Sequence, residues 1–293
     1  MLDTVRLSVS AEGVKAGDLF KRGWTVVTSR NVHRVDVWAH CVMEGVRLAY
    51  GAGFGWMTGE ASLPVLVAGD NSVLLDWGQC QKALDFIRDA AGEAVGVKLP
   101  ALDDWRVTRF DAVWAWPVSP APYIGALRFA RLPRTQARGY STSVDWVTCR
   151  GHRIRARFYD KGAEAKHAVD LPARLERQVR PRRETVRIDG ERLACGVRDL
   201  GASSVKGLLA GTLADLGLDK PIPSVLGLKG RLVQAHGKRR GANLFRVLLE
   251  ARAFGGWPGD VSRQTVARYQ RQLRQADVRA VSLDGELQAL AVG

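Results

Sequence analysis

Residues 152–164 read HRIRARFYDKGAE, and the alternation within this stretch decides which kind of fold the sequence predicts. Successive side chains of a β-strand point to opposite faces. One face of this segment is apolar and suited to a core, with Ile154, Ala156 and Phe158. The other face carries a row of cations that ends in a phenol, with Arg153, Arg155, Arg157 and Tyr159. We therefore predict a strand with one buried face over residues 151–159.

Tyr159 lies at the end of the arginine row, where it could meet a phosphate group. Neighbouring cations would stabilise the phenolate form of a side chain whose ordinary pKa is about 10. The same pattern also fits a surface strand whose tyrosine packs at the rim. Alternation alone does not separate the two interpretations.

Strand-like segments dominate the first two-thirds of the chain. We predict strands over residues 2–9, 34–40, 43–50, 64–68, 104–116, 138–149, 151–159, 172–180 and 184–188. We predict helices over residues 77–95, 119–131 and 203–217. Antiparallel strands with interspersed helices indicate an α+β fold, built on a curved antiparallel sheet with flanking helices.

The composition changes after about residue 218, where KPIPSVLG (220–227) is typical of a linker or turn. Residues 242–254 and 261–276 then predict two helices joined by a glycine-containing turn, with Ser262 as the N-cap of the second. We therefore predict a first domain over residues 1–218 and a small helical, arginine-rich module over residues 219–293.

The last predicted helix has two distinct faces. Its apolar face carries Val266, Tyr269 and Leu273. Its basic residues are Arg263 in the first turn, followed by Arg268, Arg271 and Arg274. An arginine face directed at solvent would suit DNA docking. A plain amphipathic surface helix with a solvated polar face has the same pattern.

The positive charge is concentrated in two windows. The chain of 293 residues has a net charge of +14. Residues 150–187 hold 12 Lys and Arg against 5 Asp and Glu, and residues 229–274 hold 11 against 2, so the rest of the chain is slightly acidic. Two basic windows suit two surfaces that follow a phosphate backbone.

Two carboxylates lie in predicted strands. Asp111 lies among aromatic and aliphatic residues in WRVTRFDAVWAW (105–116), where an acid is costly without a partner. Glu176 lies in PARLERQVR (172–180). Together they could hold Mg²⁺ or Mn²⁺, which prefer oxygen ligands. Each acid could equally pair with one of the abundant arginines.

Other chemistries find little support. The chain has no GxxxxGK[ST] phosphate loop, no GxGxxG, no GxSxG and no HExxH. Its four cysteines form no CxxC pair, which argues against a structural zinc site or a disulfide framework. No apolar run approaches the roughly 18 residues of a membrane span, and MLDTVRLSVS does not resemble a secretion signal. We therefore expect a cytoplasmic protein without a membrane partner.

Several stretches, in order, resemble the replication initiators of filamentous phages, which belong with the Rep-trans plasmid initiators among rolling-circle nickases. They are MLDTVRLSV (1–9), EASLPVLVAGDNSVLL (60–75), WRVTRFDAVWAW (105–116), RARFYDKGAE (155–164), LPARLERQVR (171–180) and VSRQTVARYQRQLRQADV (261–278). The last departs from the family pattern, because Val266 and Ala267 stand where members often carry aromatic residues.

The resemblance implies a role for each residue of the tyrosine motif. Tyr159 would be the nucleophile, and Lys161 would bind the phosphate. Asp111 and Glu176 would be the metal ligands. Glu164 would be a third ligand, a general base or only a salt-bridge partner.

The activity implied is metal-dependent, site-specific nicking of one strand of origin DNA. It would leave a 5′-phosphotyrosine link and a free 3′-hydroxyl for a host polymerase, working with a host helicase. A later transfer would rejoin the displaced strand, with a second subunit of a homodimer or an activated water assisting. A non-catalytic DNA-binding protein, such as a repressor or single-strand binder, would explain the basic windows equally well. A conjugative relaxase would share the chemistry.

Overall fold

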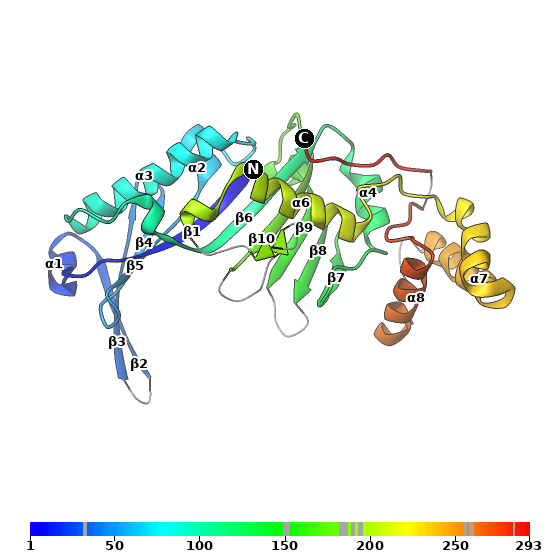
Figure 1. Ribbon diagram of the computed structural model, residues 1–293, viewed down its shortest axis with the longest axis horizontal. Helices are drawn as coiled ribbons and strands as arrows, with labels where there is room; N and C mark the ends of the chain where they lie inside the picture. Colours follow the sequence, from blue (N-terminus) through cyan, green and yellow to red (C-terminus); the bar gives the residue numbers. More distant parts are fainter. Residues whose placement is uncertain are drawn as a thin grey trace. The chain divides into compact units, whose positions relative to one another are not determined.

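The computed structural model is an α+β fold built on a ten-stranded antiparallel sheet (Figure 1). It describes residues 1–31, 34–148, 153–181, 187–188, 191–192, 196–254, 257, 261–283 and 285–293. The strand order is β2-β3-β4-β5-β1-β6-β10-β9-β8-β7, and β11 pairs with β12 separately. The predicted fold class is confirmed.

The strands of the large sheet are β1 (Leu2–Ser10), β2 (Thr25–Asn31), β3 (Arg34–Met43), β4 (Val46–Gly51), β5 (Trp56–Ser62), β6 (Arg106–Trp116), β7 (Thr135–Gly139), β8 (Ser143–Thr148), β9 (Ile154–Asp160) and β10 (Ala173–Val179). The short pair is β11 (Arg187–Ile188) and β12 (Glu191–Arg192). The α-helices are α1 (Ala16–Lys21), α2 (Leu63–Ala68), α3 (Trp77–Val95), α4 (Pro120–Leu127), α5 (Lys161–Ala165), α6 (Ala202–Leu216), α7 (Lys229–Ala253) and α8 (Arg263–Gln275).

The chain divides into two compact units, each made of two segments. Unit 1 comprises residues 1–113 and 178–208, and unit 2 comprises residues 114–177 and 209–293. This division differs from the predicted boundary at residues 218 and 219. The physical reason is that Phe129 shares one apolar core with Leu232, Leu248 and Leu273 from the C-terminal helices.

The core of unit 1 lies between strands β1, β4 and β5 and helix α3. Val5, Leu7 and Val9 alternate along β1 and are buried. Helix α3 begins at a capping box, in which Asp76 accepts from the backbone of Gln79 and the Gln79 side chain accepts from the backbone of Asp76. This helix occupies the predicted residues 77–95.

The core of unit 2 forms on the apolar face of β8 and β9. Val144, Trp146, Ala156 and Phe158 are buried there, and Tyr123 of α4 contacts Phe158 with ring centres 6.1 Å apart. The predicted alternation is confirmed at Ala156 and Phe158, which are buried, whereas Ile154 is only partly buried beside a register shift between β8 and β9. The first residues of the predicted strand, 151 and 152, lie outside the described part of the chain.

The predicted strand over residues 64–68 is wrong, because these residues form helix α2. Pro64 lies in the first turn of α2, where its missing N–H removes no hydrogen bond. Gly69 ends the helix with φ 72°, in the left-handed region that glycine adopts without strain. Pro64 and Gly69 are therefore helix boundary signals.

Several other elements differ from the prediction in extent. The predicted strand over residues 138–149 is a hairpin of β7 and β8, and β2, β5 and α1 carry no clear pattern in the sequence. The first C-terminal helix begins at Lys229, and Ser262 caps α8 as predicted, accepting from the backbone N–H of Thr265 at 3.2 Å. Cys41 and Cys80 are free thiols, while Cys149 and Cys195 lie outside the described residues.

Helix α7 contains a sharp bend at Gly237, whose φ of 77° is accessible to glycine. After the bend, Gly241 lies against the backbone of the preceding helical segment. A Cβ at Gly241 would meet the backbone of Leu232 and would stand 2.6 Å from the Cα of Val233. The two segments of α7 can pack together only because residue 241 has no side chain.

We expect Gly241→Val to lower the free energy of unfolding by about 3 kcal/mol, because the clash is with backbone that cannot rotate away. Urea denaturation followed by tryptophan fluorescence would measure this loss. Gly230→Val, on the same helix, is the matched control, since nothing lies within 4 Å of a Cβ there. Equal losses in both variants would contradict the close approach at Gly241.

Candidate active site

Strand β9 places the predicted nucleophile near its end, within unit 2. Tyr159 is directly opposite Arg174 of β10 and Ser143 of β8, and opposite residues of an antiparallel pair share a face. Arg157 shares this face and is directly opposite Glu176 and Asp145. The sheet therefore gathers polar and charged side chains from three strands on the face that carries Tyr159.

Tyr159 is more buried than the sequence pattern predicts. Tyr159 is only 5% exposed, and Arg174, opposite it on β10, is 2% exposed. The guanidinium carbon of Arg157 lies 5.4 Å from the centre of the Tyr159 ring, a cation–π distance. The phenol is thus held beside cations, in a largely desolvated position.

Arg157 is held by carboxylates. Its Nε donates to Asp145 at 2.9 Å, and its Nη1 lies 3.5 Å from Glu164. Burial alone would lower the pKa of Arg157, but the charges of Asp145, Glu164 and Glu176 raise it above its ordinary value. A guanidinium fixed in this way orients the Tyr159 ring beside it. Because two carboxylates balance its charge, it attracts DNA phosphates less strongly than an exposed arginine would.

Lys161 begins helix α5, two residues after Tyr159. Asp160 caps this helix by accepting from the backbone N–H of Ala163 at 3.0 Å. Lys161 is 2% exposed, and its Nζ donates to Glu164 at 2.6 Å. Three roles are open for Glu164, and in the structure it is a salt-bridge partner of Lys161. Lys161 therefore adds a second cation, a buried ammonium group, two residues after Tyr159 in the sequence.

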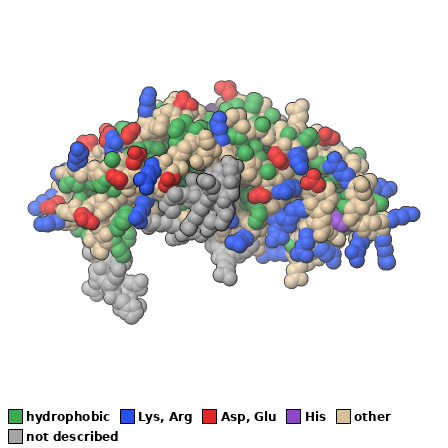
Figure 2. All heavy atoms as spheres, in the orientation of Figure 1, with side chains coloured by type: hydrophobic (Ala, Val, Ile, Leu, Met, Phe, Trp, Pro, Cys, Tyr) green, Lys and Arg blue, Asp and Glu red, His purple; other side chains and the backbone are tan. Residues whose placement is uncertain are grey.

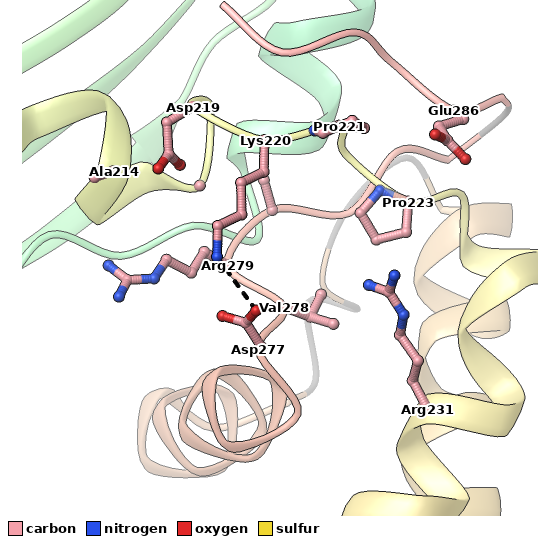
Figure 3. Close-up of a pocket in the computed structure, with 12 residues that line it drawn as sticks. Ala214, Asp219, Lys220, Pro221, Pro223, Arg231, Asp277, Val278, Arg279 and Glu286 are labelled. Atoms are coloured by element: carbon pink, nitrogen blue, oxygen red, sulfur yellow. Dashed lines mark hydrogen bonds and ion pairs between the residues drawn. The ribbon is translucent and has the colours of Figure 1, made fainter. Parts of the chain in front are cut away.

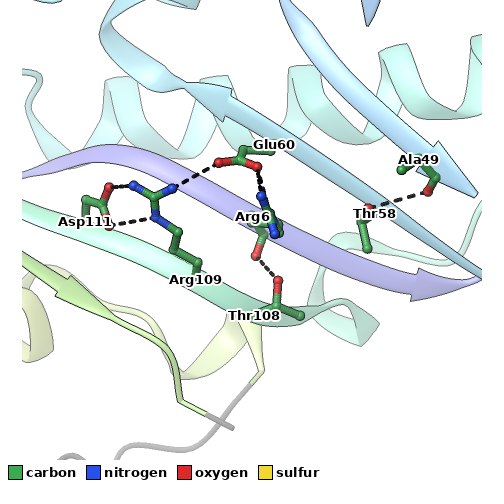
Figure 4. A network of polar contacts seen from close by, with 7 residues as sticks. All are labelled: Arg6, Ala49, Thr58, Glu60, Thr108, Arg109 and Asp111. Carbon is green, nitrogen blue, oxygen red and sulfur yellow. Dashed lines mark hydrogen bonds and ion pairs between the residues drawn. The ribbon is translucent and has the colours of Figure 1, made fainter. Parts of the chain in front are cut away.

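Asp111 lies in unit 1, inside a network of charged side chains (Figure 4). Arg109 donates to both of its carboxylate oxygens, with Nε at 3.1 Å from Oδ1. Arg109 also donates to Glu60 at 3.1 Å, and Glu60 pairs with Arg6. Burial raises the pKa of Asp111 to about 6, although its hydrogen bond and charge interaction with Arg109 act in the opposite direction.

The carboxylates expected to hold a metal each face a basic side chain. Asp111 pairs with Arg109, and Glu164 pairs with Lys161 and Arg157. Within the residues that the structure describes, no three His, Cys, Asp or Glu side chains come together as a metal site would require. The basic side chains that pair with Asp111 and Glu164 would compete with a metal ion for the same carboxylate oxygens. The predicted metal roles of Asp111, Glu164 and Glu176 stay predictions.

The raised pKa of Asp111 predicts a pH-dependent stability. The unfolded carboxyl titrates at about 4, so the folded state binds more protons between pH 4 and pH 6. Stability from this group is therefore full below pH 4 and is lost as the pH rises through about 6. Relative to the wild type, we expect Asp111→Asn to be more stable at pH 8 than at pH 4 by about 1–2 kcal/mol, because only the wild type loses stability as this carboxyl ionises.

Thermal unfolding at pH 4 and pH 8 would check this expectation. The variant should gain on the wild type at pH 8 and lose that gain at pH 4. Asp103→Asn serves as the control, since Asp103 is exposed and should show no such difference. A loss of stability in Asp111→Asn that is equal at both pH values would contradict the prediction.

The predicted arginines of α8 are exposed. Arg263, Arg268, Arg271 and Arg274 all lie on the surface, while Leu273 is buried. Burial and the nearby charges of Arg131, Arg279 and Arg271 lower the pKa of Arg274, which marks a crowd of like charges. Lys and Arg side chains gather in Figure 2 over the region where Figure 1 draws α7 and α8. Such a surface favours the binding of a polyanion.

Two pockets lie in the C-terminal part of unit 2. The first, of about 390 Å³, is lined by Arg240, Asn243, Arg268, Tyr269 and Gln272 from α7 and α8. Guanidinium and amide groups of this kind commonly contact nucleic-acid backbones. The second, of about 380 Å³, mixes both charges, with Lys220 3.4 Å from Asp277 (Figure 3). Its charges are paired locally, so it offers no distinct preference for an anion.

Sequence reasoning missed Asp145 and Arg174. Asp145 lies between apolar residues in SVDWVT (143–148), which is the same signal that singled out Asp111. It is buried and pairs with Arg157. Nothing in the residues that flank Arg174 indicates that it would be buried opposite Tyr159.

Among the residues that the structure describes, no helix is both long and apolar enough to cross a membrane.

Comparison with known proteins gives a likeness among solved structures. No family model matches the chain, and no curated protein matches it. Among solved structures, the chain is similar to a rolling circle replication initiator protein from Geobacillus stearothermophilus. The two share 12% sequence identity over 61% of this chain and 73% of that chain, with a TM-score of 0.31.

Proposed function

We propose that this protein nicks one strand of DNA at a replication origin by attack of Tyr159, and so starts rolling-circle replication. The observation that supports the proposal best is the position of Tyr159. Its phenol lies at the end of β9 with the Arg157 guanidinium 5.4 Å from its ring, and the buried Lys161 follows two residues later. The ordered sequence motifs shared with phage initiators point to the same residue.

In the proposed reaction, the Tyr159 oxygen attacks a backbone phosphorus in line with the bond to the 3′ oxygen. The bond from phosphorus to tyrosine forms as the bond to the 3′ oxygen breaks. The phenol loses its proton, and the departing 3′ oxygen gains one. The products are a 5′-phosphotyrosine link and a free 3′-hydroxyl. One phosphodiester replaces another, so the step needs no ATP.

The cations around Tyr159 supply electrostatic support in this proposal. Arg157, beside the ring, would help to balance the negative charge on the Tyr159 oxygen during attack. Lys161 would balance the negative charge that builds up on the phosphate in the transition state. Its bond to Glu164 holds the ammonium group in place.

The remaining parts of the proposal concern DNA and its partners. Arg155 of β9, Arg153 just before this strand and the exposed arginines of α8 would bind the origin DNA backbone. Mg²⁺ or Mn²⁺, if required, would polarise the phosphate. A host polymerase would extend the 3′-hydroxyl while a host helicase unwinds the duplex, and a homodimer could supply a second tyrosine for rejoining.

Because Tyr159 is buried, the nickase proposal requires the phenol to become exposed, and this requirement favours a second candidate function. A phenol on a residue 5% exposed must be uncovered before it can reach a phosphorus atom. A non-catalytic DNA-binding protein needs no such opening, and the exposed basic surface of α7 and α8 would serve it.

Incubation with a supercoiled plasmid that carries the cognate origin, with and without Mg²⁺, separates the two. Nicked plasmid with covalently attached protein supports the nickase. A shifted but intact plasmid under both conditions supports the DNA-binding protein. If nicking is as efficient in EDTA as in Mg²⁺, the metal is removed from the proposal and the attack by Tyr159 stays part of it.

A further inference from the structure

The face of the sheet opposite α3, in unit 1, carries three rows of side chains across neighbouring strands. The register pairs align the strands β3, β4, β5 and β1, and in two of the rows β6 as well. The first row consists of Trp38, Gly51, Trp56 and Ser10. The second consists of His40, Ala49, Thr58, Ser8 and Arg106. The third consists of Val42, Arg47, Glu60, Arg6 and Arg109.

The first row is aromatic, and a glycine lies at its centre. The rings of Trp38 and Phe54 are 6.2 Å apart. A Cβ at Gly51 would stand 3.0 Å from the Trp38 ring and 3.4 Å from the Phe54 ring, so the missing side chain lets both rings lie over the strand. Phe54 is 48% exposed, so its ring adds apolar surface open to solvent beside Trp38.

Trp56 extends this row toward β6. The guanidinium carbon of Arg106 lies 5.3 Å from the centre of the Trp56 ring. Arg106 is exposed, and it has no ion pair within the described part of the chain. Trp38 and Trp56 are both half-buried, so each keeps ring surface open to solvent. The row thus combines flat aromatic surface with a guanidinium group.

The third row is charged and has more cations than anions. Arg6 and Arg109 both pair with Glu60, as Figure 4 shows. Arg47 is exposed on the next strand, opposite Glu60 in register. Arg106 in the second row and Arg47 in the third add two exposed arginines to the pairs that Arg6 and Arg109 make with Glu60 and Asp111. The third row is four residues from the aromatic row along each strand, a separation of about 13 Å, and Arg106 of the second row lies between them.

We infer that this face, defined by Trp38, Phe54, Trp56, Arg47 and Arg106, binds single-stranded DNA. Bases that are unstacked and unpaired expose their flat faces, and aromatic side chains beside a basic groove hold them by stacking. A duplex hides those faces, and an apolar protein partner would not use the arginines. The choice of DNA over RNA rests on the proposed function, in which nicking and unwinding release a single strand.

The experiment measures binding of the full chain to fluorescein-labelled oligo(dT) of 20 nucleotides, by anisotropy in EDTA. A hairpin duplex of equal charge is measured in parallel, because the arginines of α8 are expected to bind DNA as well. We expect Trp56→Ala to weaken oligo(dT) binding about tenfold, with duplex binding within twofold of the wild type. Trp56→Phe should restore most of the affinity, because it keeps an aromatic ring.

Charge is tested with Arg47→Gln against Lys82→Gln, an exposed lysine of α3. We expect Arg47→Gln to reduce the salt dependence of oligo(dT) binding by about one released ion, and Lys82→Gln to leave it unchanged. Thermal unfolding of each variant establishes that it is folded.

Several outcomes would overturn the inference. Stacking predicts that Trp56→Phe binds oligo(dT) more tightly than Trp56→Ala, so equal binding by the two variants argues against stacking. Equal weakening of single-stranded and duplex binding would indicate a general polyanion surface. Tighter binding to oligo(rU) than to oligo(dT) would reassign the ligand to RNA. Binding through this face without any nicking leaves the inference standing and removes the proposed function.

Discussion

Tyr159→Phe is expected to abolish nicking of the supercoiled origin plasmid, with a loss of at least about 1,000-fold and no covalent protein–DNA adduct. The variant removes a single oxygen, and that oxygen is the atom that would attack phosphorus. The phenylalanine ring keeps its packing and its place beside Arg157, so folding should be preserved. Binding to the same DNA, measured by a mobility shift, should remain within about threefold of the wild type.

Tyr140→Phe is the matched control. Tyr140 precedes β8, its backbone N–H donates to Ser143 at 2.7 Å, and it is 49% exposed. It is the second candidate nucleophile, because it is more accessible than Tyr159. If Tyr140→Phe loses the adduct while Tyr159→Phe keeps it, the assignment moves to Tyr140. If both variants nick normally, the tyrosine mechanism itself is wrong.

Phe158→Ala is expected to lower the free energy of unfolding by about 3–5 kcal/mol, the typical loss for a fully buried phenylalanine. Phe158 is completely buried, and its ring lies 6.4 Å from Trp116 and 6.1 Å from Tyr123. Truncation removes these contacts and leaves a cavity directly beneath β9. Urea denaturation, followed by tryptophan fluorescence and by circular dichroism, would measure the loss.

Phe20→Ala makes the same substitution at a side chain that is 69% exposed, and it should cost less than about 1 kcal/mol. Phe158→Leu should fall between the two, since leucine fills part of the cavity. A result in which Phe158→Ala and Phe20→Ala are equal would mean that β9 does not rest on this core. Nicking by Phe158→Ala should also fall, because the strand that carries Tyr159 loses its support.

Local pattern predicted the structure well where a few neighbouring residues decide it. Alternation identified the buried face of β9, and the helical pattern over residues 77–95 matches α3. Residues 64–68 show the limit of such reasoning, since LPVLVA is apolar enough for a strand and forms α2 instead. Strand β5 (WMTGEAS) has a glycine and a glutamate in its middle, and its pairing with β1 and β4 makes it a strand.

The candidate site was predicted in composition more than in arrangement. The spacing of Tyr159 and Lys161 is visible in the sequence, and so is the need of Asp111 for a partner. The partner is Arg109, two residues earlier on the same strand. The sequence holds many arginines, and its pattern does not single out this one. The pair between Arg157 and Asp145 joins residues on different strands, and no spacing in the sequence indicates it.

The sequence by itself determined which side chains share a face of β9, where α3 lies and which residue caps α8, because these features depend on contacts within a few residues. Only the tertiary structure decided the strand order, the burial of Tyr159 and Arg174, and the carboxylate partners of Arg157. These depend on which distant segments pack together. The burial of a side chain, and the charge that it meets there, are set by neighbours that the sequence places far away.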